Sequence, residues 1–274
     1  MRPTILDPHD TIKNILLLLV QEIDDASVSN NKKIHSIRVA TKKIRSILYL
    51  MKSFLKDKEL MENKKRFYKE LSKNLSQDRE KKVMRDTLHS VVKKCKLLSN
   101  DFMDVENALN YETKTIDFER NIQLCKEHIL SELNSMDKQE IGICKKRDIK
   151  KGFKRTYKKA YDLLHIALLT KKIEEIHCFR KYAKYHMYQI QLLSNHIDYP
   201  IKKSKYLDKL TSILGKSHDL SFFEDHINNN KNFKNSSLLL YCIEKRQKKL
   251  IKKAIKLANK IFKDRDQDFK LFTN

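Results

Sequence analysis

Residues that make turns are nearly absent from this chain, and their absence limits the folds open to it. The 274 residues include 3 glycines and 3 prolines, whereas average usage is about 7% and 5%. A sheet protein needs such residues at many of its turns, so we expect a mostly helical chain. The glycines Gly142, Gly152 and Gly215 are never clustered. A glycine-rich phosphate loop and a dinucleotide-binding fingerprint are therefore excluded.

Apolar residues recur at helical spacing along most of the chain. We expect breaks between helices at residues 76–78, at the asparagine run 228–230 and after Gly215. The helices predicted from this spacing span about residues 10–24, 31–56, 60–75, 78–98, 114–133, 148–169, 173–197, 203–214, 219–229 and 235–264, with a short helix and a loop in 101–113.

The charge of the chain predicts a polyanionic partner. Lys and Arg number 59 against 35 Asp and Glu, a formal net charge of +24, and a compact body with this charge repels itself. Of the basic residues 47 are Lys and 12 are Arg. Lysine acts as a point charge that suits phosphate oxygens and reads base edges poorly. The charge therefore favours phosphate or nucleic-acid-backbone binding, although much of it is expected on solvated helix surfaces.

The remaining composition gives no sign of a metal, a cofactor or a membrane span. The five cysteines are odd in number and form no CxxC pair, so we expect reduced thiols in an intracellular protein. The longest apolar run, Ile15 to Val20, is far shorter than the roughly 20 residues of a bilayer span. The N-terminus does not resemble a signal peptide. We therefore expect a cytoplasmic protein.

A short motif occurs twice. His35-Ser36-Ile37-Arg38 recurs 142 positions later as His177-Cys178-Phe179-Arg180, and Lys42 and Lys184 each follow the histidine by seven. Arg79 and His218 also open helices after a break, 139 positions apart. The same order and similar offset predict two halves, residues 1–136 and 140–274, each a bundle of about four helices.

Helix geometry places the repeated residues on one stripe. At about 100° per residue, an arc of about 80° holds the polar residues His35, Arg38, Lys42, Arg45 and Tyr49, and the apolar residues occupy the other side. No acid lies on this stripe, so its like charges repel by a few tenths of a kcal/mol per pair. An external anion would relieve that repulsion. The alternative is a solvated face, or pairing with acids of other helices such as Glu80 or Asp219.

The second copy repeats the polar stripe but lacks one of its cations. His177, Arg180, Lys184 and Tyr188 share an arc, with Lys181 at its edge, whereas Met187 stands where the first copy has Arg45.

These motifs together resemble the CHAD family, the conserved-histidine α-helical domain. The first signature lies in IHSIRVATKKIRSIL and the second begins at His177. The strings LSQDRE and LGKSHD resemble the family's break after Leu-Gly, with Ser76 and Glu80 as departures in the first copy. GFKRTYKKAY resembles the helix that opens the second half. The likeness covers nearly the whole chain in the expected order.

The resemblance implies two four-helix bundles related by a pseudo-twofold axis, with a basic groove or pore between them. It also implies binding of inorganic polyphosphate, and thereby targeting to polyphosphate granules. Lys, Arg and protonated His are suitable donors to phosphate. The expected contacts are His35, Arg38, Lys42, Lys43, Arg45, Arg79, Arg155, Lys159, His177, Arg180, Lys181, Lys184, Tyr188 and His218.

The sequence leaves three other functions open. Binding of nucleic acid is the second choice, since net charge supports it but no reader motif occurs and most aromatic residues sit at apolar helical positions. An enzyme using His35 or His177 is disfavoured because the polar arc holds no carboxylate to orient an imidazole or a metal. Binding of anionic membranes by the basic C-terminal helix is the last alternative. We expect a binding protein without catalytic activity.

Overall fold

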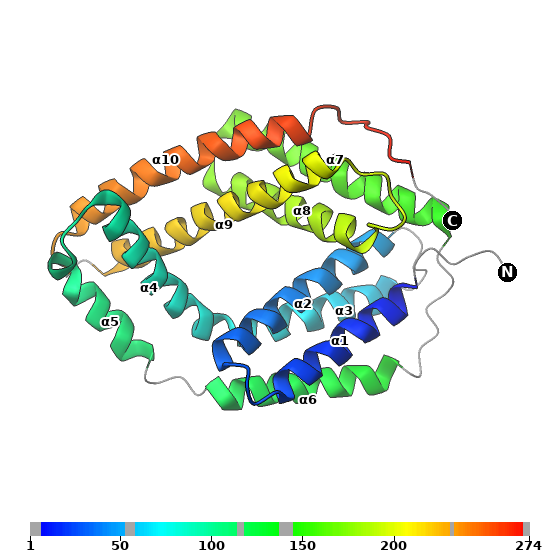
Figure 1. Ribbon diagram of the computed structural model, residues 1–274, viewed down its shortest axis with the longest axis horizontal. Helices are drawn as coiled ribbons and strands as arrows, with labels where there is room; N and C mark the ends of the chain where they lie inside the picture. Colours follow the sequence, from blue (N-terminus) through cyan, green and yellow to red (C-terminus); the bar gives the residue numbers. More distant parts are fainter. Residues whose placement is uncertain (1–6, 53–57, 114–117, 137–144, 231–232, 271–274) are drawn as a thin grey trace.

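The computed structural model describes residues 7–52, 58–113, 118–136, 145–230 and 233–270, without the side chains of residues 58, 76–79 and 111–113. These residues form helices and no sheet, which confirms the predicted all-α fold (Figure 1). The helices are α1 (Pro8–Asp24), α2 (Asn30–Met51), α3 (Lys58–Asn74), α4 (Ser76–Cys95), the 3-10 helix η1 (Ser99–Phe102), α5 (Met103–Thr113), α6 (Phe118–Met136), α7 (Lys146–Thr170), α8 (Ile173–Leu192), α9 (Ile201–Asn229) and α10 (Ser236–Ile261).

One predicted break is absent, because α9 continues through Gly215. The prediction of two helices, 203–214 and 219–229, is therefore wrong. A glycine inside a helix costs only about 1 kcal/mol relative to alanine, and the buried side of α9 remains apolar from Leu207 through Leu214 to Leu220. The break predicted at residues 76–78 lies one residue earlier, at Leu75, since α3 ends at Asn74 and α4 begins at Ser76. The break predicted at residues 228–230 is present, since α9 ends at Asn229.

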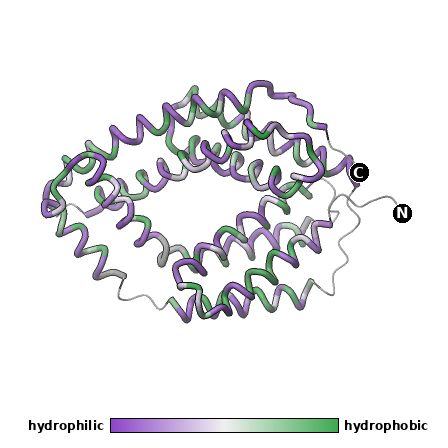
Figure 2. The backbone as a smooth tube through the Cα atoms, in the orientation of Figure 1, coloured by the Kyte–Doolittle hydropathy of each residue, from purple (hydrophilic) through white to green (hydrophobic). Residues whose placement is uncertain are grey.

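The helices pack around three apolar clusters. The first joins α1, α2, α3 and α6, and the second joins α7, α8, α9 and α10. The third brings α4 and α5 against the end of α9 and the start of α10. Hydrophobic and hydrophilic segments alternate along each helix, as the packing of amphipathic helices requires (Figure 2). The clusters thus group α1, α2, α3 and α6, and α7 to α10, while the two duplicated bundles with their bounds 1–136 and 140–274 and the pseudo-twofold relation stay predictions.

The helices α2 and α7 cross at very short range. A Cβ atom at Gly152 of α7 would lie 2.0 Å from the carbonyl oxygen of Leu50, so this position requires glycine. Nearby, Nη2 of Arg155 donates hydrogen bonds to the carbonyl oxygens of Tyr49 and Leu50, at 2.5 and 3.3 Å. A cation at the C-terminal end of a helix is electrostatically favourable. The start of α7 therefore caps the end of α2 and fixes its position.

The helices α2 and α8 are joined by a buried hydrogen bond. The side-chain nitrogen of Gln189 donates to the carbonyl oxygen of Ser46 at 2.9 Å. Gln189 is fully buried, so breaking this bond would leave a polar group without solvent. The bond holds the C-terminal end of α8 against the part of α2 that carries Arg45.

Candidate functional site

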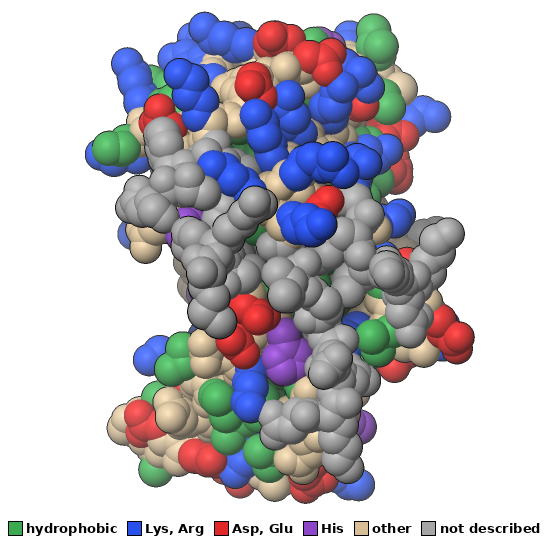
Figure 3. Space-filling view, turned by 90° about the vertical axis from the view of Figure 1, so that its right-hand side faces the viewer, with side chains coloured by type: hydrophobic (Ala, Val, Ile, Leu, Met, Phe, Trp, Pro, Cys, Tyr) green, Lys and Arg blue, Asp and Glu red, His purple; other side chains and the backbone are tan. Residues whose placement is uncertain are grey.

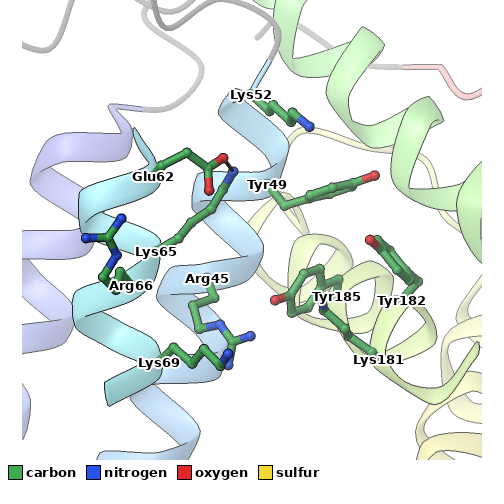
Figure 4. A pocket seen from close by; sticks show the side chains of 10 residues that line it. All are labelled: Arg45, Tyr49, Lys52, Glu62, Lys65, Arg66, Lys69, Lys181, Tyr182 and Tyr185. Carbon is green, nitrogen blue, oxygen red and sulfur yellow. Dashed lines mark hydrogen bonds and ion pairs between the residues drawn. The ribbon is translucent and has the colours of Figure 1, made fainter. Parts of the chain in front are cut away.

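A basic pocket opens where α2, α3 and α8 meet, with a volume of about 400 Å³ (Figure 4). Its lining side chains come from both halves of the chain. Arg45 and Lys69 point from α2 and α3 into the space in front of α8, where Lys181 and Tyr185 lie. The basic pocket is lined by Arg45, Tyr49 and Lys52, by Glu62, Lys65, Arg66 and Lys69, and by Lys181, Tyr182 and Tyr185.

The electrostatics of the basic pocket favour an anion. Six cations line it and Glu62 is the one carboxylate among the described lining residues, where it pairs with Lys65 at 2.6 Å. Burial lowers the pKa of Lys181, and the charges of Arg45, Lys69 and Lys65 lower it further. Like charges from two other helices, α2 and α3, therefore act on the ammonium group of Lys181, and a bound anion would offset that repulsion.

Three tyrosines form one wall of the basic pocket. The ring centroids of Tyr49 and Tyr182 are 5.3 Å apart, and Tyr185 lies 5.8 Å from each of them. Nζ of Lys181 lies 5.4 Å from the Tyr182 centroid and 5.9 Å from that of Tyr185. Burial raises the pKa of Tyr49 to about 12, so this hydroxyl stays neutral and can donate a hydrogen bond to an anion.

Elements far from the pocket hold this wall in place. Arg155 places its guanidinium carbon 5.1 Å from the Tyr49 centroid while it caps α2. The Gln189 bond to Ser46 fixes the residue next to Arg45. The pocket geometry therefore depends on the docking of α7 and α8 onto α2.

A second group of predicted residues lies at the junction of α8 and α9. The rings of His177 and His218 are 4.6 Å apart. Nε2 of His177 and Nδ1 of His218 are buried and have no hydrogen-bond partner among the described residues. Burial lowers the pKa of His177, and His218 and Arg180 lower it further. We call His177 and His218 the histidine pair.

Other predicted residues of α8 surround the histidine pair. Arg180 lies next to Gly215 of α9, since a Cβ atom at Gly215 would lie 3.8 Å from Nη2 of Arg180, an ordinary van der Waals distance. Nζ of Lys184 lies 5.6 Å from the ring centroid of the buried Tyr188. His177, Arg180, Lys181, Lys184 and Tyr188 follow one another along α8, so this helix connects the histidine pair to the basic pocket.

The predicted residues of the first copy are separated by the fold. Arg45 lines the basic pocket, whereas His35 and Lys43 line a different pocket between α1 and α2. Nη1 of Arg38 donates to the carbonyl oxygen of Ser72, at 2.7 Å, near the end of α3. Lys42 is half-buried on the same helix. The side chain of Arg79 lies outside the described residues.

The predicted residues of α7 lie away from the pocket opening. Arg155 contacts the end of α2 as described, and Lys159 is exposed. The pKa of Asp162 is lowered chiefly by its hydrogen bond from Arg265, and the charge of Lys159 lowers it further. Lys159 therefore has a carboxylate in its surroundings.

A lysine face of α7, formed by Lys150, Lys154 and Lys158, is paired with the carboxylates of the chain's end. Lys150 and Lys154 lie 3.2 and 2.9 Å from Asp268, and Lys158 pairs with Asp266. Hydrogen bonds from Lys154 and Lys150 lower the pKa of Asp268 to about 2. Basic and acidic side chains also lie next to one another in the upper part of the side of the molecule that Figure 3 shows.

Sequence reasoning missed every cation that α3 brings to the pocket. Lys65 and Lys69 are one turn apart and share a face of α3. That spacing was a usable signal, but it is also typical of an ordinary solvated helix. Lys52, Arg66, Tyr182 and Tyr185 were missed as well.

The described residues hold no group of three His, Cys, Asp or Glu suited to a metal ion. None of the helices in the described ranges is long and apolar enough to span a bilayer. The cations and tyrosines that line the basic pocket offer electrostatic and hydrogen-bonding contacts to an anion.

Comparisons with known proteins identify the family. Residues 18–228 match the CHAD domain, and because this is most of the chain, the protein belongs to the CHAD family. The crystal structure of the CHAD domain from the plant Ricinus communis is similar, with a TM-score of 0.66 and 13% sequence identity, and the match covers 99% of each chain. At this identity the likeness concerns the fold. No curated protein matches the chain.

CHAD is a family of non-catalytic helical domains that bind polyphosphate in general. The resemblance inferred from the sequence motifs is thus confirmed at the level of the family.

Proposed function

We propose that this chain binds inorganic polyphosphate in the basic pocket and along α8 toward the histidine pair. The observation that carries the proposal is the convergence of Arg45, Lys65, Lys69 and Lys181 from three helices, with one carboxylate among the described lining residues. A chain of phosphates supplies repeated negative charges at short spacing, which suits such a pocket. Further expected contacts are His177, Arg180, Lys184, Tyr188 and His218, and Arg38 and Lys42 on α2.

The geometry of α8 supports an extended ligand over a single phosphate. His177 and Lys184 are seven residues apart, which is about 10 Å of helix, and Lys181 of the basic pocket lies between them. An extended polyanion can contact both regions at once. Through this binding, the protein associates with polyphosphate granules.

The test pairs two double variants with the same change in charge. Arg45→Glu with Lys181→Glu alters the basic pocket, and Lys150→Glu with Lys154→Glu alters the lysine face of α7. In the pocket variant the new carboxylates face Lys65 and Lys69, so folding is retained. We expect polyphosphate affinity to fall about a hundredfold or more, since each lost charged hydrogen bond contributes about 1.5–3 kcal/mol. The polyphosphate affinity of the α7 variant should fall by less than about threefold, because Lys150 and Lys154 lie outside the basic pocket and salt screens their charges from a ligand there.

Competition with duplex DNA separates the two kinds of polyanion. Labelled long-chain polyphosphate is bound at moderate salt, and unlabelled polyphosphate or duplex DNA of equal total charge is added. Polyphosphate should displace the label at far lower concentration. Displacement by DNA at equal or lower concentration, or equal losses in both double variants, would overturn the proposal.

A further inference from the structure

Two cysteines meet at the junction of α4 and α10, outside the basic pocket. Cys95 is the last residue of α4 and continues the apolar stripe of Leu88 and Val91. Cys242 lies beside Ile243 in α10. All these residues pack in or against the third apolar cluster, which joins the first part of the chain to the second. We call Cys95 and Cys242 the thiol pair.

Arg246 marks the same junction and lies beside both thiols. It follows Cys242 by one turn of α10, and its Nη2 donates to Oγ of Ser90 on α4 at 3.2 Å. Burial lowers the pKa of Arg246, whereas Cys95 and Cys242 raise it, so their sulfurs lie close to the guanidinium. Arg246 therefore links α4 to α10 at the place where the two thiols lie.

The two thiols differ in access to solvent. Cys95 is half-buried, whereas Cys242 is 6% exposed. Burial raises the pKa of Cys242 and the neighbouring Cys95 thiol raises it further, while Lys245 and Arg246 act in the opposite direction. A reagent from solution therefore reaches Cys95 first, and Cys242 is placed to react second.

We propose that Cys95 and Cys242 form a reversible disulfide that ties α4 to α10 when the protein meets a low-molecular-weight disulfide. Both sulfurs belong to one packed cluster, they share one guanidinium neighbour, and one of them is accessible. The other described cysteines have different settings, since Cys178 is exposed on α8 and Cys125 is buried in the first cluster.

The reaction is a pair of thiol–disulfide exchanges. The thiolate of Cys95 attacks one sulfur of the small disulfide, whose S–S bond breaks and releases one thiolate, leaving a mixed disulfide on Cys95. The thiolate of Cys242 then attacks the Cys95 sulfur and releases the second small thiolate. The two protons lost by the cysteines go to the two released thiolates. The protein loses two electrons, and the small disulfide is reduced to two thiols.

The crosslink would act at the end of the molecule that lies away from the two chain ends (Figure 1). There α4 and α5 close against α9 and α10. A covalent link at this place would hold the two parts of the chain together even when the third cluster loosens.

The experiment exposes the full-length protein to oxidised glutathione and then blocks free thiols with N-ethylmaleimide. Peptide mapping by mass spectrometry without reduction should find Cys95 joined to Cys242. Dithiothreitol should reverse the link. The reaction should accelerate from about pH 7 to pH 9, because thiolate is the reactive form. Exposed Cys178 serves as an internal control that should keep a glutathione adduct.

Single variants separate the two steps. Cys242→Ser should leave a stable glutathione adduct on Cys95, and Cys95→Ser should leave Cys242 largely unmodified. In the unaltered protein, oxidation should raise the midpoint of thermal unfolding relative to the dithiothreitol-treated sample. A persistent adduct on Cys95 beside a free Cys242, or the absence of a Cys95–Cys242 peptide in the folded wild-type protein, would overturn the proposal.

Discussion

The basic pocket and α7 are both rich in cations, but their charges have different surroundings. On α7, Lys150, Lys154 and Lys158 pair with Asp266 and Asp268, and Arg155 donates to the carbonyls at the end of α2. In the basic pocket, cations from α2, α3 and α8 face one another. The difference teaches that net charge alone does not locate an anion site in a basic protein. A better guide to such a site is a place where cations from several helices converge with few carboxylates among them.

From this difference we expect α7 to have a structural role and the basic pocket to have a binding role. Substitutions where α7 packs on α2 and α8 should therefore lower the stability of the fold. Substitutions in the basic pocket should lower ligand affinity. The following three measurements test this division, beginning with the largest expected effect.

Gly152→Ala should cause the largest loss of stability. The new Cβ atom would lie 2.0 Å from the Leu50 carbonyl oxygen, so α7 must move away from α2. We expect the free energy of unfolding to fall by about 3 kcal/mol, at the upper end for overpacking. Chemical denaturation measures the change.

Gly215→Ala is the matched control. Its Cβ atom would lie 3.8 Å from Nη2 of Arg180, an ordinary contact, and alanine favours a helix by up to about 1 kcal/mol. This variant should be as stable as the parent or more so. Equal destabilisation by both substitutions would contradict the close crossing of α2 and α7.

His186→Phe should reduce the acid sensitivity of the fold. His186 is fully buried against Phe153 and Tyr157 of α7, and burial lowers its pKa from 6.5 to about 3. The folded-state pKa lies below the unfolded one, so this group destabilises the fold progressively as the pH falls below 6.5. The loss is about 1.4 kcal/mol per pH unit, or about 2 kcal/mol near pH 5.

Unfolding midpoints between about pH 7 and 5 measure this effect. The His186→Phe protein should lose correspondingly less stability over that range than the parent. His165→Gln alters an exposed histidine of α7 and should leave the parent's acid loss in place. An unchanged pH profile for His186→Phe would show that acid sensitivity arises elsewhere.

Arg45→Gln with Lys181→Gln should have the smallest effect on stability, and in the opposite direction. The folded-state pKa of Lys181 is lowered, so its charged form disfavours the fold at neutral pH. Removing the two charges should raise the free energy of unfolding slightly, by about 0.5 kcal/mol after solvent screening. Thermal unfolding at low salt measures the gain. A clear loss of stability would mean that Arg45 and Lys181 stabilise the fold, which would contradict their proposed role in binding.

Much of the fold followed from local sequence. Apolar spacing on α2 predicted its buried side, where Ile37, Ile44 and Ile47 are almost fully buried. The scarcity of glycine and proline predicted an all-helical chain. The continuity of α9 could not be predicted from the sequence, because Gly215 and the nearby His218 resemble a turn. The packing of α9 against other helices is what keeps it continuous.

The repeated motif predicted candidate residues better than it predicted their positions. His35 and His177 occupy equivalent places in the repeat, yet His35 lies beside α1 whereas His177 contacts the ring of His218. The lysines of α3 were missed because their role depends on α8, more than a hundred residues later in the chain. Local spacing predicts which side of a helix is polar. Only the tertiary packing determines which other helix that side faces.

The basic pocket joins residues 45–69 to residues 181–185, and this separation has a consequence for biosynthesis. When the first helices leave the ribosome, their lysines have no opposite wall, so they form an open cationic surface. The site becomes complete only after α8 has been made and has docked through Gln189. A ligand that spans the two walls would therefore bind only the finished polypeptide, and it would hold early and late parts of the chain together.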